Sequence, residues 1–259
     1  MKIQFESSTA CNARCTFCPR DRMKRKGGQM TDELFHKIIK EGKEIKDSYF
    51  VPFLNGEPFV FPKIWEWLDY MRDVKVLLVT NAEYMDVDRL IKYPNIISVY
   101  CSVNATTKET HKKVMRGPDF DKVIKNVESL IAKSKFRIRV SMVVVEANQH
   151  EVKDFKKRWG RRAKTCRFVN WMGDVHDPLE LQGERFPCKA LMDGITVLWD
   201  GRVVPCCLDY EGKLIIGDAN KQTLSEIWGQ SSWMRECHNK LQFDMDPCRN
   251  CNHNTKCQT

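Results

Sequence analysis

Short apolar runs along the chain alternate with longer stretches in which apolar residues recur every three or four positions. The short runs predict buried strands, and the longer spacing predicts amphipathic helices. The predicted strands cover residues 3–7, 50–54, 75–80, 96–103, 137–145 and 166–170. The predicted helices cover residues 32–44, 63–71, 87–92, 120–133 and 151–158, and Thr31 is the expected N-cap of the first helix.

The alternation of strands with helices predicts an α/β fold with parallel strands and right-handed crossovers. Six such units predict a partial (β/α)6 TIM barrel, which is more open than the eightfold barrel and places its chemistry at the carboxyl ends of the strands. Polar motifs do follow the first four predicted strands. They are CNARCTFCPR, Asn55-Gly56-Glu57-Pro58, Thr80-Asn81-Ala82, and Ser102 with Asn104. These motifs are therefore expected to share one rim of the barrel.

The regular alternation stops near residue 171, where glycine, proline and cysteine become frequent. We place a boundary within residues 171–187, with a barrel over residues 1–175 and a small cysteine-bearing extension over residues 176–259. Asp200-Gly201 lies between two apolar runs at 195–199 and 202–204, which predicts a β-hairpin. Residues 224–240 have a helical pattern. The predicted extension is thus a β-hairpin plus a helix.

Twelve cysteines among 259 residues direct the search for chemistry. The amino-terminal sequence MKIQFESS lacks the apolar core of a secretory signal, and no apolar run approaches the ~20 residues of a membrane span. In an unexported chain, so many cysteines favour metal or redox use over a disulfide scaffold. Because thiolate clusters need a reducing compartment, we expect a cytoplasmic protein with no membrane partner.

The first motif holds Cys11, Cys15 and Cys18 in a C-x3-C-x2-C spacing, directly after the first predicted strand. Three thiolates on one short loop can hold three corners of a 4Fe–4S cluster and leave the fourth iron without a protein ligand. Most clusters are held by four cysteines, so three predict a cluster that binds something else. The alternative is a zinc site, which would draw its remaining ligands from elsewhere in the chain.

With aromatic Phe17 between the last two cysteines, this motif resembles the signature of the radical S-adenosylmethionine (SAM) superfamily. The resemblance implies that the open iron is chelated by the amino and carboxylate groups of SAM. It also implies reductive cleavage of SAM to a 5′-deoxyadenosyl radical, which abstracts hydrogen from a substrate. The cofactor supplies that chemistry, and the protein supplies binding, orientation and exclusion of water.

Two further stretches resemble SAM-binding signatures of the same superfamily. Asn55-Gly56-Glu57-Pro58 resembles its GGEP motif, with Asn55 in place of the first glycine, and the resemblance implies contact with the SAM amino group. In the stretch at 101–120, Ser102 matches a ribose-binding serine and Arg116 matches an arginine that pairs with the SAM carboxylate. Asn104 stands where the family often has an acid. The alternatives are an ordinary turn at residues 55–58 and a surface arginine at 116.

Four later cysteines suggest a second cluster. Cys188 and Cys206 flank the predicted hairpin, and Cys248 and Cys251 form a C-x2-C pair. Four thiolates can ligate a 4Fe–4S cluster fully, and a zinc ribbon is the alternative. The pattern resembles the Twitch domain, a shortened SPASM extension of radical SAM barrels, and the layout is similar to that of 2-deoxy-scyllo-inosamine dehydrogenases. It implies one auxiliary cluster.

The remaining five cysteines have no assigned partner in this scheme. Most are expected to be small core residues. One of them could donate a hydrogen atom to a substrate radical, and Cys207 is the first candidate because it adjoins a ligand cysteine. The five are Cys101, Cys166, Cys207, Cys237 and Cys257, with Cys257 expected to hold no cluster.

Two other catalytic candidates lie on the loop that follows the last predicted strand. Asp174 and His176 could orient or deprotonate a substrate hydroxyl, because a carboxylate and an imidazole are common general bases. The alternative for His176 is a solvated loop histidine.

Part of the net charge of +9 is concentrated in one short segment. It is interpreted either as a solvated helix face or as a docking surface for an acidic electron donor such as a flavodoxin or ferredoxin. Nucleic acid is disfavoured as a partner, because the segment lacks interleaved aromatic residues. The basic residues are Lys153, Lys156, Lys157, Arg158, Arg161, Arg162, Lys164 and Arg167.

Together these patterns predict a radical SAM oxidoreductase that oxidises a small polar substrate by two electrons, with one auxiliary 4Fe–4S cluster as acceptor of the second electron. One alternative is a peptide-modifying enzyme or epimerase with a cysteine hydrogen donor, which would need a separate leader-binding partner. Another is a non-catalytic, metal-bound module that contacts nucleic acid or protein.

Overall fold

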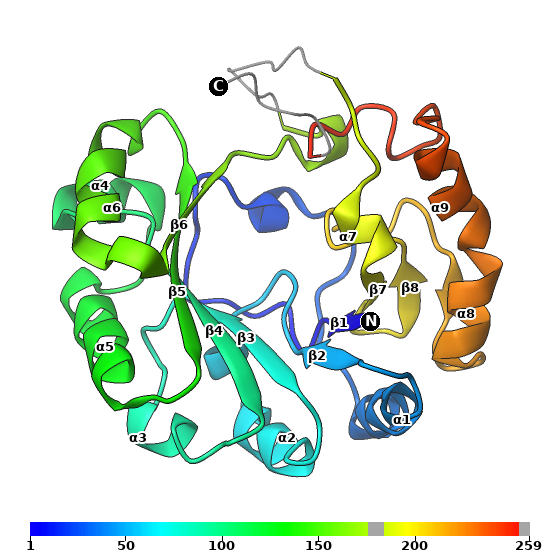
Figure 1. Cartoon of the computed structure of the whole chain (residues 1–259), viewed down its shortest axis with the longest axis horizontal. Helices are drawn as coiled ribbons and strands as arrows, with labels where there is room; N and C mark the ends of the chain where they lie inside the picture. Colours follow the sequence, from blue (N-terminus) through cyan, green and yellow to red (C-terminus); the bar gives the residue numbers. More distant parts are fainter. Residues whose placement is uncertain (176–183, 254–259) are drawn as a thin grey trace.

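A sheet of parallel strands curves through the barrel region, in the order β6-β5-β4-β3-β2-β1 (Figure 1). The computed structural model describes residues 1–175 and 184–253. The sheet is not closed, and this confirms the predicted α/β partial barrel. The six strands are β1 (Lys2–Phe5), β2 (Tyr49–Val51), β3 (Val76–Thr80), β4 (Ile96–Ser102), β5 (Arg137–Val144) and β6 (Ala163–Arg167).

Helices cover the outer face of this curved sheet, while its inner face surrounds an open centre (Figure 1). The Thr31 hydroxyl accepts a hydrogen bond from the Leu34 amide at 3.3 Å, which confirms the predicted cap. The fourth helix was not predicted, because its sequence KETHKKV has too few apolar residues to show a stripe. The helices are α1 (Asp32–Lys43), α2 (Ile64–Tyr70), α3 (Val87–Leu90), α4 (Lys108–Val114), α5 (Phe120–Lys133) and α6 (Val152–Trp159).

An aromatic stack fixes the first two helices on the sheet. Phe35 of α1 lies parallel to Trp67 of α2, with ring centroids 3.9 Å apart, and Phe5 of β1 contacts both rings. All three side chains are buried. Large rings of this kind bury ~150–250 Å² each, so the stack anchors the end of β1 from which the cysteine loop departs.

The sixth strand begins three residues earlier than its predicted start at residue 166. β6 lies at the edge of the sheet, and its residues alternate between half-buried and exposed. An edge strand tolerates charged residues such as Lys164 and Arg167. The sequence pattern predicts a later strand because residues 168 and 169 are apolar, but these two residues lie beyond β6.

The carboxyl-terminal extension continues the same sheet rather than forming a separate one. β7 (Gly194–Val197) pairs in parallel with β1, and β8 (Arg202–Val204) and β9 (Gly217–Asp218) follow as antiparallel neighbours. The β7–β8 pair is the predicted hairpin. Residues 224–240 form two helices in place of one, α8 (Leu224–Gln230) and α9 (Ser232–Asn239), and α7 (Lys189–Met192) precedes the hairpin. No helix in the described ranges is long and apolar enough to cross a membrane.

Candidate cofactor-binding site

The three amino-terminal cysteines lie together on the loop after β1, and each is half-buried. The Cys18 amide donates to the Cys15 carbonyl at 3.1 Å, and the Ala13 amide contacts the Cys11 sulfur at 3.4 Å. Burial raises the pKa of Cys11 to about 11. Burial also raises the pKa of Cys15, and the nearby thiols of Cys18 and Cys11 raise it further. The three thiols therefore lie near enough on one short loop to affect one another's ionisation.

A turn after α4 packs directly on this cysteine loop. The Arg14 amide donates to the Arg116 carbonyl at 2.8 Å, and the Thr16 amide donates to the Val114 carbonyl at 2.9 Å. Gly117 has a φ of +140°, and a Cβ there would collide with the carbonyl oxygen of Asn12. The backbone thus brings Arg116 beside the cysteines, and its side chain is exposed. This is the neighbourhood that the resemblance implied for an arginine that meets the SAM carboxylate.

The loop after β2 packs on the other side of the cysteine loop. The Glu57 amide donates to the Ala10 carbonyl at 2.8 Å, and a Cβ on Gly56 would collide with the carbonyl oxygen of Ser8. Gly56 is therefore required for the approach of two chain segments. Asn55, which stands in place of the usual glycine, donates its amide to Glu6 at 3.0 Å.

Glu57 joins the ends of β2 and β3. Its carboxylate accepts the Thr80 hydroxyl at 2.6 Å and the Asn81 amide at 2.7 Å. The side chain is fully buried, and this burial raises the pKa of Glu57 to about 7, against the opposing effect of those hydrogen bonds. The carboxylate thus fixes the rim around the cysteine loop.

Ser102 and Asn104 at the end of β4 have different environments. Ser102 is half-buried and lies 3.5 Å from the Ser141 hydroxyl. Asn104 is buried, accepts the Val143 amide at 2.8 Å and donates to the Met115 sulfur at 3.0 Å. Asn104 therefore ties β4 to β5 and to the end of α4, which explains an amide where an acid was expected.

A buried ion pair beneath the rim was not predicted. Glu6 and Arg25 lie 2.6 Å apart, with side chains 0% and 5% exposed. Arg25 also donates to the Tyr210 carbonyl at 2.5 Å, and the Glu211 carboxylate accepts the Arg25 amide at 3.0 Å. The pair joins the end of β1 to the segment after the cysteines and to the extension. The sequence feature that could have indicated this pair is the charged Glu6 within an otherwise apolar strand pattern.

The four later cysteines line one largely enclosed cavity in the extension, together with the apolar side chains of residues 191, 205 and 208. Cys188 precedes α7, Cys206 follows β8, and Cys248 and Cys251 lie in the loop after α9. Burial raises the pKa of Cys248 to about 12, and the thiols of Cys251 and Cys188 contribute to the rise. Four convergent thiols in an apolar cavity fit a fully ligated iron–sulfur cluster.

One loop touches both groups of cysteines. The Trp171 indole donates to the Phe17 carbonyl, between Cys15 and Cys18, at 2.8 Å. The next residue, Met172, lines the cavity of the four later cysteines. The loop therefore connects the two predicted cluster sites directly.

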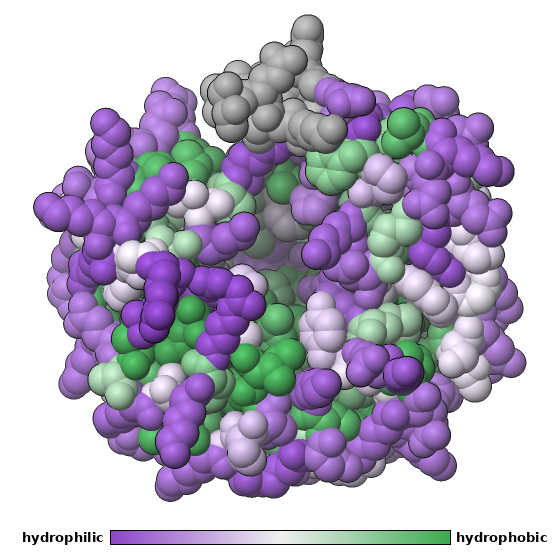
Figure 2. Space-filling view, in the orientation of Figure 1, coloured by the Kyte–Doolittle hydropathy of each residue, from purple (hydrophilic) through white to green (hydrophobic). Residues whose placement is uncertain are grey.

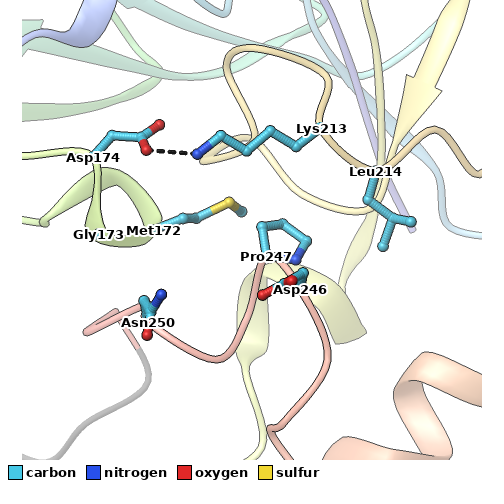
Figure 3. A pocket seen from close by; sticks show the side chains of 8 residues that line it. All are labelled: Met172, Gly173, Asp174, Lys213, Leu214, Asp246, Pro247 and Asn250. Atoms are coloured by element: carbon cyan, nitrogen blue, oxygen red, sulfur yellow. Dashed lines mark hydrogen bonds and ion pairs between the residues drawn. The ribbon is translucent and has the colours of Figure 1, made fainter.

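A pocket of about 480 Å³ lies beside this loop (Figure 3). Asp174 and Lys213 point toward one another along one side, with Nζ and Oδ1 2.5 Å apart, and Asp246 and Asn250 lie across from them. The pKa of Tyr210 is raised by burial and by its hydrogen bond to Asp174. The carboxylate of Asp174 is thus already paired. His176 lies outside the described residues.

The other cysteines differ in exposure. Cys101 is buried in the core, whereas Cys166 is exposed on β6, so the core interpretation was wrong for Cys166. Cys207 and Cys237 are half-buried, and Cys207 packs against a small apolar cluster of Leu54, Leu198 and Val204. Cys257 lies outside the described residues.

The basic segment at 153–167 includes Arg161 and Arg162, which immediately precede β6 and line a groove with Arg137 at the start of β5. These residues lie at the amino ends of the strands. The cysteine loop departs from a carboxyl end. Arg161 and Arg162 therefore lie at the opposite end of the barrel from the cysteine loop, whereas Arg167 of the same segment ends β6 at its carboxyl end.

Figure 2 shows that the molecule is hollowed at the centre of one face, with both hydrophilic and hydrophobic residues on the rim.

Family models agree with both parts of this site. The radical SAM superfamily model matches residues 5–158, and the model of SPASM, an iron–sulfur cluster-binding domain, matches residues 188–252. The chain belongs to the radical SAM superfamily. This confirms the predicted family and its cofactors, which are SAM, a 4Fe–4S cluster that binds it, and an auxiliary iron–sulfur cluster.

The chain is also similar to three individual proteins. Mycofactocin maturase MftC of Mycobacterium tuberculosis is 23% identical over 307 residues, which cover 99% of this chain and 76% of MftC. BtrN in complex with AdoMet and 2-DOIA superposes with a TM-score of 0.67 at 17% identity, covering 97% of this chain and 92% of BtrN. Streptococcus suis SuiB bound to precursor peptide SuiA superposes with a TM-score of 0.72 at 14% identity, covering 96% of this chain and 69% of SuiB. At these identities the two structures show the shared fold.

Proposed function

We propose that the chain is a radical SAM oxidoreductase that oxidises a small polar substrate, such as a sugar-like or cyclitol alcohol, by two electrons. The supporting observation is the cavity lined by Cys188, Cys206, Cys248 and Cys251. Four thiolates leave no iron of an auxiliary cluster open to a substrate, so that cluster is suited to carry electrons. The similarity to BtrN, which was crystallised with AdoMet and 2-DOIA, supports a small-molecule substrate.

When bound, SAM and the two clusters supply the radical that removes a hydrogen atom and an acceptor for the second electron. The residues of the chain hold and orient these groups. Cys11, Cys15 and Cys18 would hold three irons of the first cluster, Arg116 would pair with the SAM carboxylate and Ser102 would bind the ribose. The alcohol proton must also leave, and Asp174, which lines the adjacent pocket, is the candidate acceptor.

The test compares anaerobically reconstituted wild type with the C248A/C251A variant. Wild type should contain about eight irons and the variant about four. With SAM, dithionite and candidate alcohols, both should form 5′-deoxyadenosine, and a deuterium label in it would mark the attacked carbon. Only the wild type should yield ketone, measured by mass spectrometry. Ketone formation by a variant with four irons would remove the auxiliary cluster from the mechanism.

A second candidate function is peptide modification, and the similarity to SuiB, which was crystallised with a precursor peptide, favours it. An epimerase would need a thiol near the substrate. The sheet register pairs Ser102 of β4 with Ser141 of β5, and Ser141 with Lys164 of β6. Side chains two residues apart on a strand share a face, so Cys166 lies on the same inner face of the sheet as Ser102. Its exposed thiol joins Cys207 as a candidate hydrogen donor. Solvent deuterium incorporated into a peptide Cα, and lost in C166A or C207A, would support this function over alcohol oxidation.

The reductant that we propose is an acidic flavodoxin or ferredoxin that docks near the cysteine loop. Exposed basic residues follow the cysteines, including Arg22, Lys24 and Lys26. Such charges steer an acidic partner and make the association depend on salt. Replacement of Lys24 and Lys26 by glutamate should slow reduction by the donor but not by dithionite, and equal rates would exclude this surface.

The reducing cytoplasm is the compartment that we propose, because seven ligand cysteines must stay reduced. Family membership favours the enzyme over the non-catalytic nucleic-acid or protein module.

A further inference from the structure

His238 is a buried histidine with only one of its two ring nitrogens paired. It lies in α9, its side chain is 1% exposed, and its ring packs edge-on against Phe243 with centroids 5.0 Å apart. Its Nδ1 accepts the amide hydrogen of Cys188 at 3.3 Å, while its Nε2 is buried without a partner among the described residues. Buried polar atoms are nearly always paired, so this nitrogen requires an explanation.

The position of the imidazole supplies that explanation. His238 lines the cavity of the four later cysteines, together with Arg185. Because Nδ1 is an acceptor, a neutral ring must carry its proton on Nε2. The unpaired group is thus an N–H donor on a residue that lines a cavity whose other lining, apart from Arg185, is thiol and apolar.

We propose that His238 Nε2–H donates a hydrogen bond to a sulfur of the auxiliary cluster and so raises the reduction potential of that cluster. This inference rests on the proposed four-cysteine ligand set. The sulfides and thiolates of a cluster are acceptors, and hydrogen bonds to them are among the features that set its potential. A bond to sulfur stabilises the more negative, reduced state.

Arg185 acts in the same direction. Its guanidinium lines the cavity, donates to the Cys248 carbonyl at 2.8 Å and lies over Phe243 at 4.3 Å from the ring centroid. A positive charge and an N–H donor on one side of the cluster both favour an added electron. The auxiliary site is therefore built to accept an electron, which agrees with the proposed oxidation.

The test isolates the auxiliary cluster in a C11A/C15A/C18A background. In that background the potential is measured by redox titration followed by electron paramagnetic resonance, with no turnover required. His238→Leu should lower the potential while about four irons remain. His238→Gln, which keeps an amide donor, should recover part of the shift. The matched control is His111→Leu, because His111 is also 1% exposed with an unpaired Nε2 but lies in α4, outside this cavity.

A second measurement does not depend on a variant that folds. With ¹⁵N-labelled histidine, the reduced auxiliary cluster of this background should show a ¹⁵N coupling and an exchangeable proton coupling. Both should persist in His253→Ala, because His253 Nδ1 also lies 3.7 Å from the Cys188 sulfur. An absent coupling, or an unchanged potential in His238→Leu with four irons retained, would overturn the proposal. A C11A/C15A/C18A protein that binds no iron would instead overturn the ligand set, and the hydrogen bond with it, which separates the two failures.

Discussion

The indole nitrogen of Trp171 donates a hydrogen bond to the carbonyl oxygen of Phe17 at 2.8 Å. Phe17 lies between two cysteines of the amino-terminal loop, and the residue after Trp171 lines the cavity of the auxiliary site. The contact spans 154 positions of sequence. It therefore sets the position of one proposed cluster relative to the other, on which electron transfer between substrate and auxiliary cluster depends.

Removal of this donor should loosen the connection. Trp171→Phe keeps an aromatic ring but loses the hydrogen bond, which is worth about 1 kcal/mol net. For a protein of this size, that predicts a fall in melting temperature of about 2–4 °C. It should also raise the ratio of 5′-deoxyadenosine to oxidised product. Trp233→Phe is the control, because Trp233 is 47% exposed. Equal melting temperatures for the two variants would show that the contact contributes nothing.

The Glu6–Arg25 pair should be among the most sensitive polar contacts of the molecule. Removing one partner of a buried pair typically costs about 3–5 kcal/mol, because the other charge is left uncompensated. We expect Arg25→Met to lower the free energy of unfolding by that amount, measured with urea, and Glu6→Gln/Arg25→Met to recover part of it. Lys108→Met breaks an exposed pair with Asp121 and should cost about 1 kcal/mol or less. A similar loss in Arg25→Met and Lys108→Met would contradict the expected role of burial.

The sequence predicts the barrel and the positions of the cysteines well, because periodic burial and ligand spacing are local properties. Less predictable are the contacts that cross the chain. The side chain of Asn55, a residue predicted to bind cofactor, also donates to Glu6, and Gly56 makes room for a neighbouring carbonyl. No sequence pattern singles out His238, because its hydrogen-bond partner, the amide of Cys188, lies fifty positions earlier in the chain. Such pairings are set by how β7 joins β1, which no local pattern encodes.

Gly56 offers a direct test of how closely the rim is packed. A methyl group there would meet the Ser8 carbonyl, which is fixed backbone. Overpacking of this kind typically costs about 1–3 kcal/mol, and the displaced loop should also weaken SAM binding measured by equilibrium dialysis. Gly229 lies inside α8 with nothing within 4 Å of an added Cβ. Gly229→Ala should therefore stabilise the protein by about 0.5–1 kcal/mol through helix propensity. A Gly56→Ala variant with an unchanged free energy of unfolding and unchanged SAM binding would show that the loop can shift to accommodate the methyl group.

The buried carboxyl of Glu57 predicts a specific dependence of stability on pH. Its pKa rises from 4.5 to about 7 on folding, mainly through burial. Between these values the folded state binds more protons than the unfolded state, so stability falls as the pH rises from 4.5 through 7. Each pKa unit corresponds to about 1.4 kcal/mol, which predicts a loss of about 3 kcal/mol across that range. Glu57→Gln keeps the acceptor for the Asn81 amide but cannot ionise. As the pH is raised from 4.5 to 8, the free energy of unfolding of wild type should therefore fall relative to that of Glu57→Gln. A constant difference would mean that Glu57 is already ionised throughout, because its hydrogen bonds outweigh its desolvation.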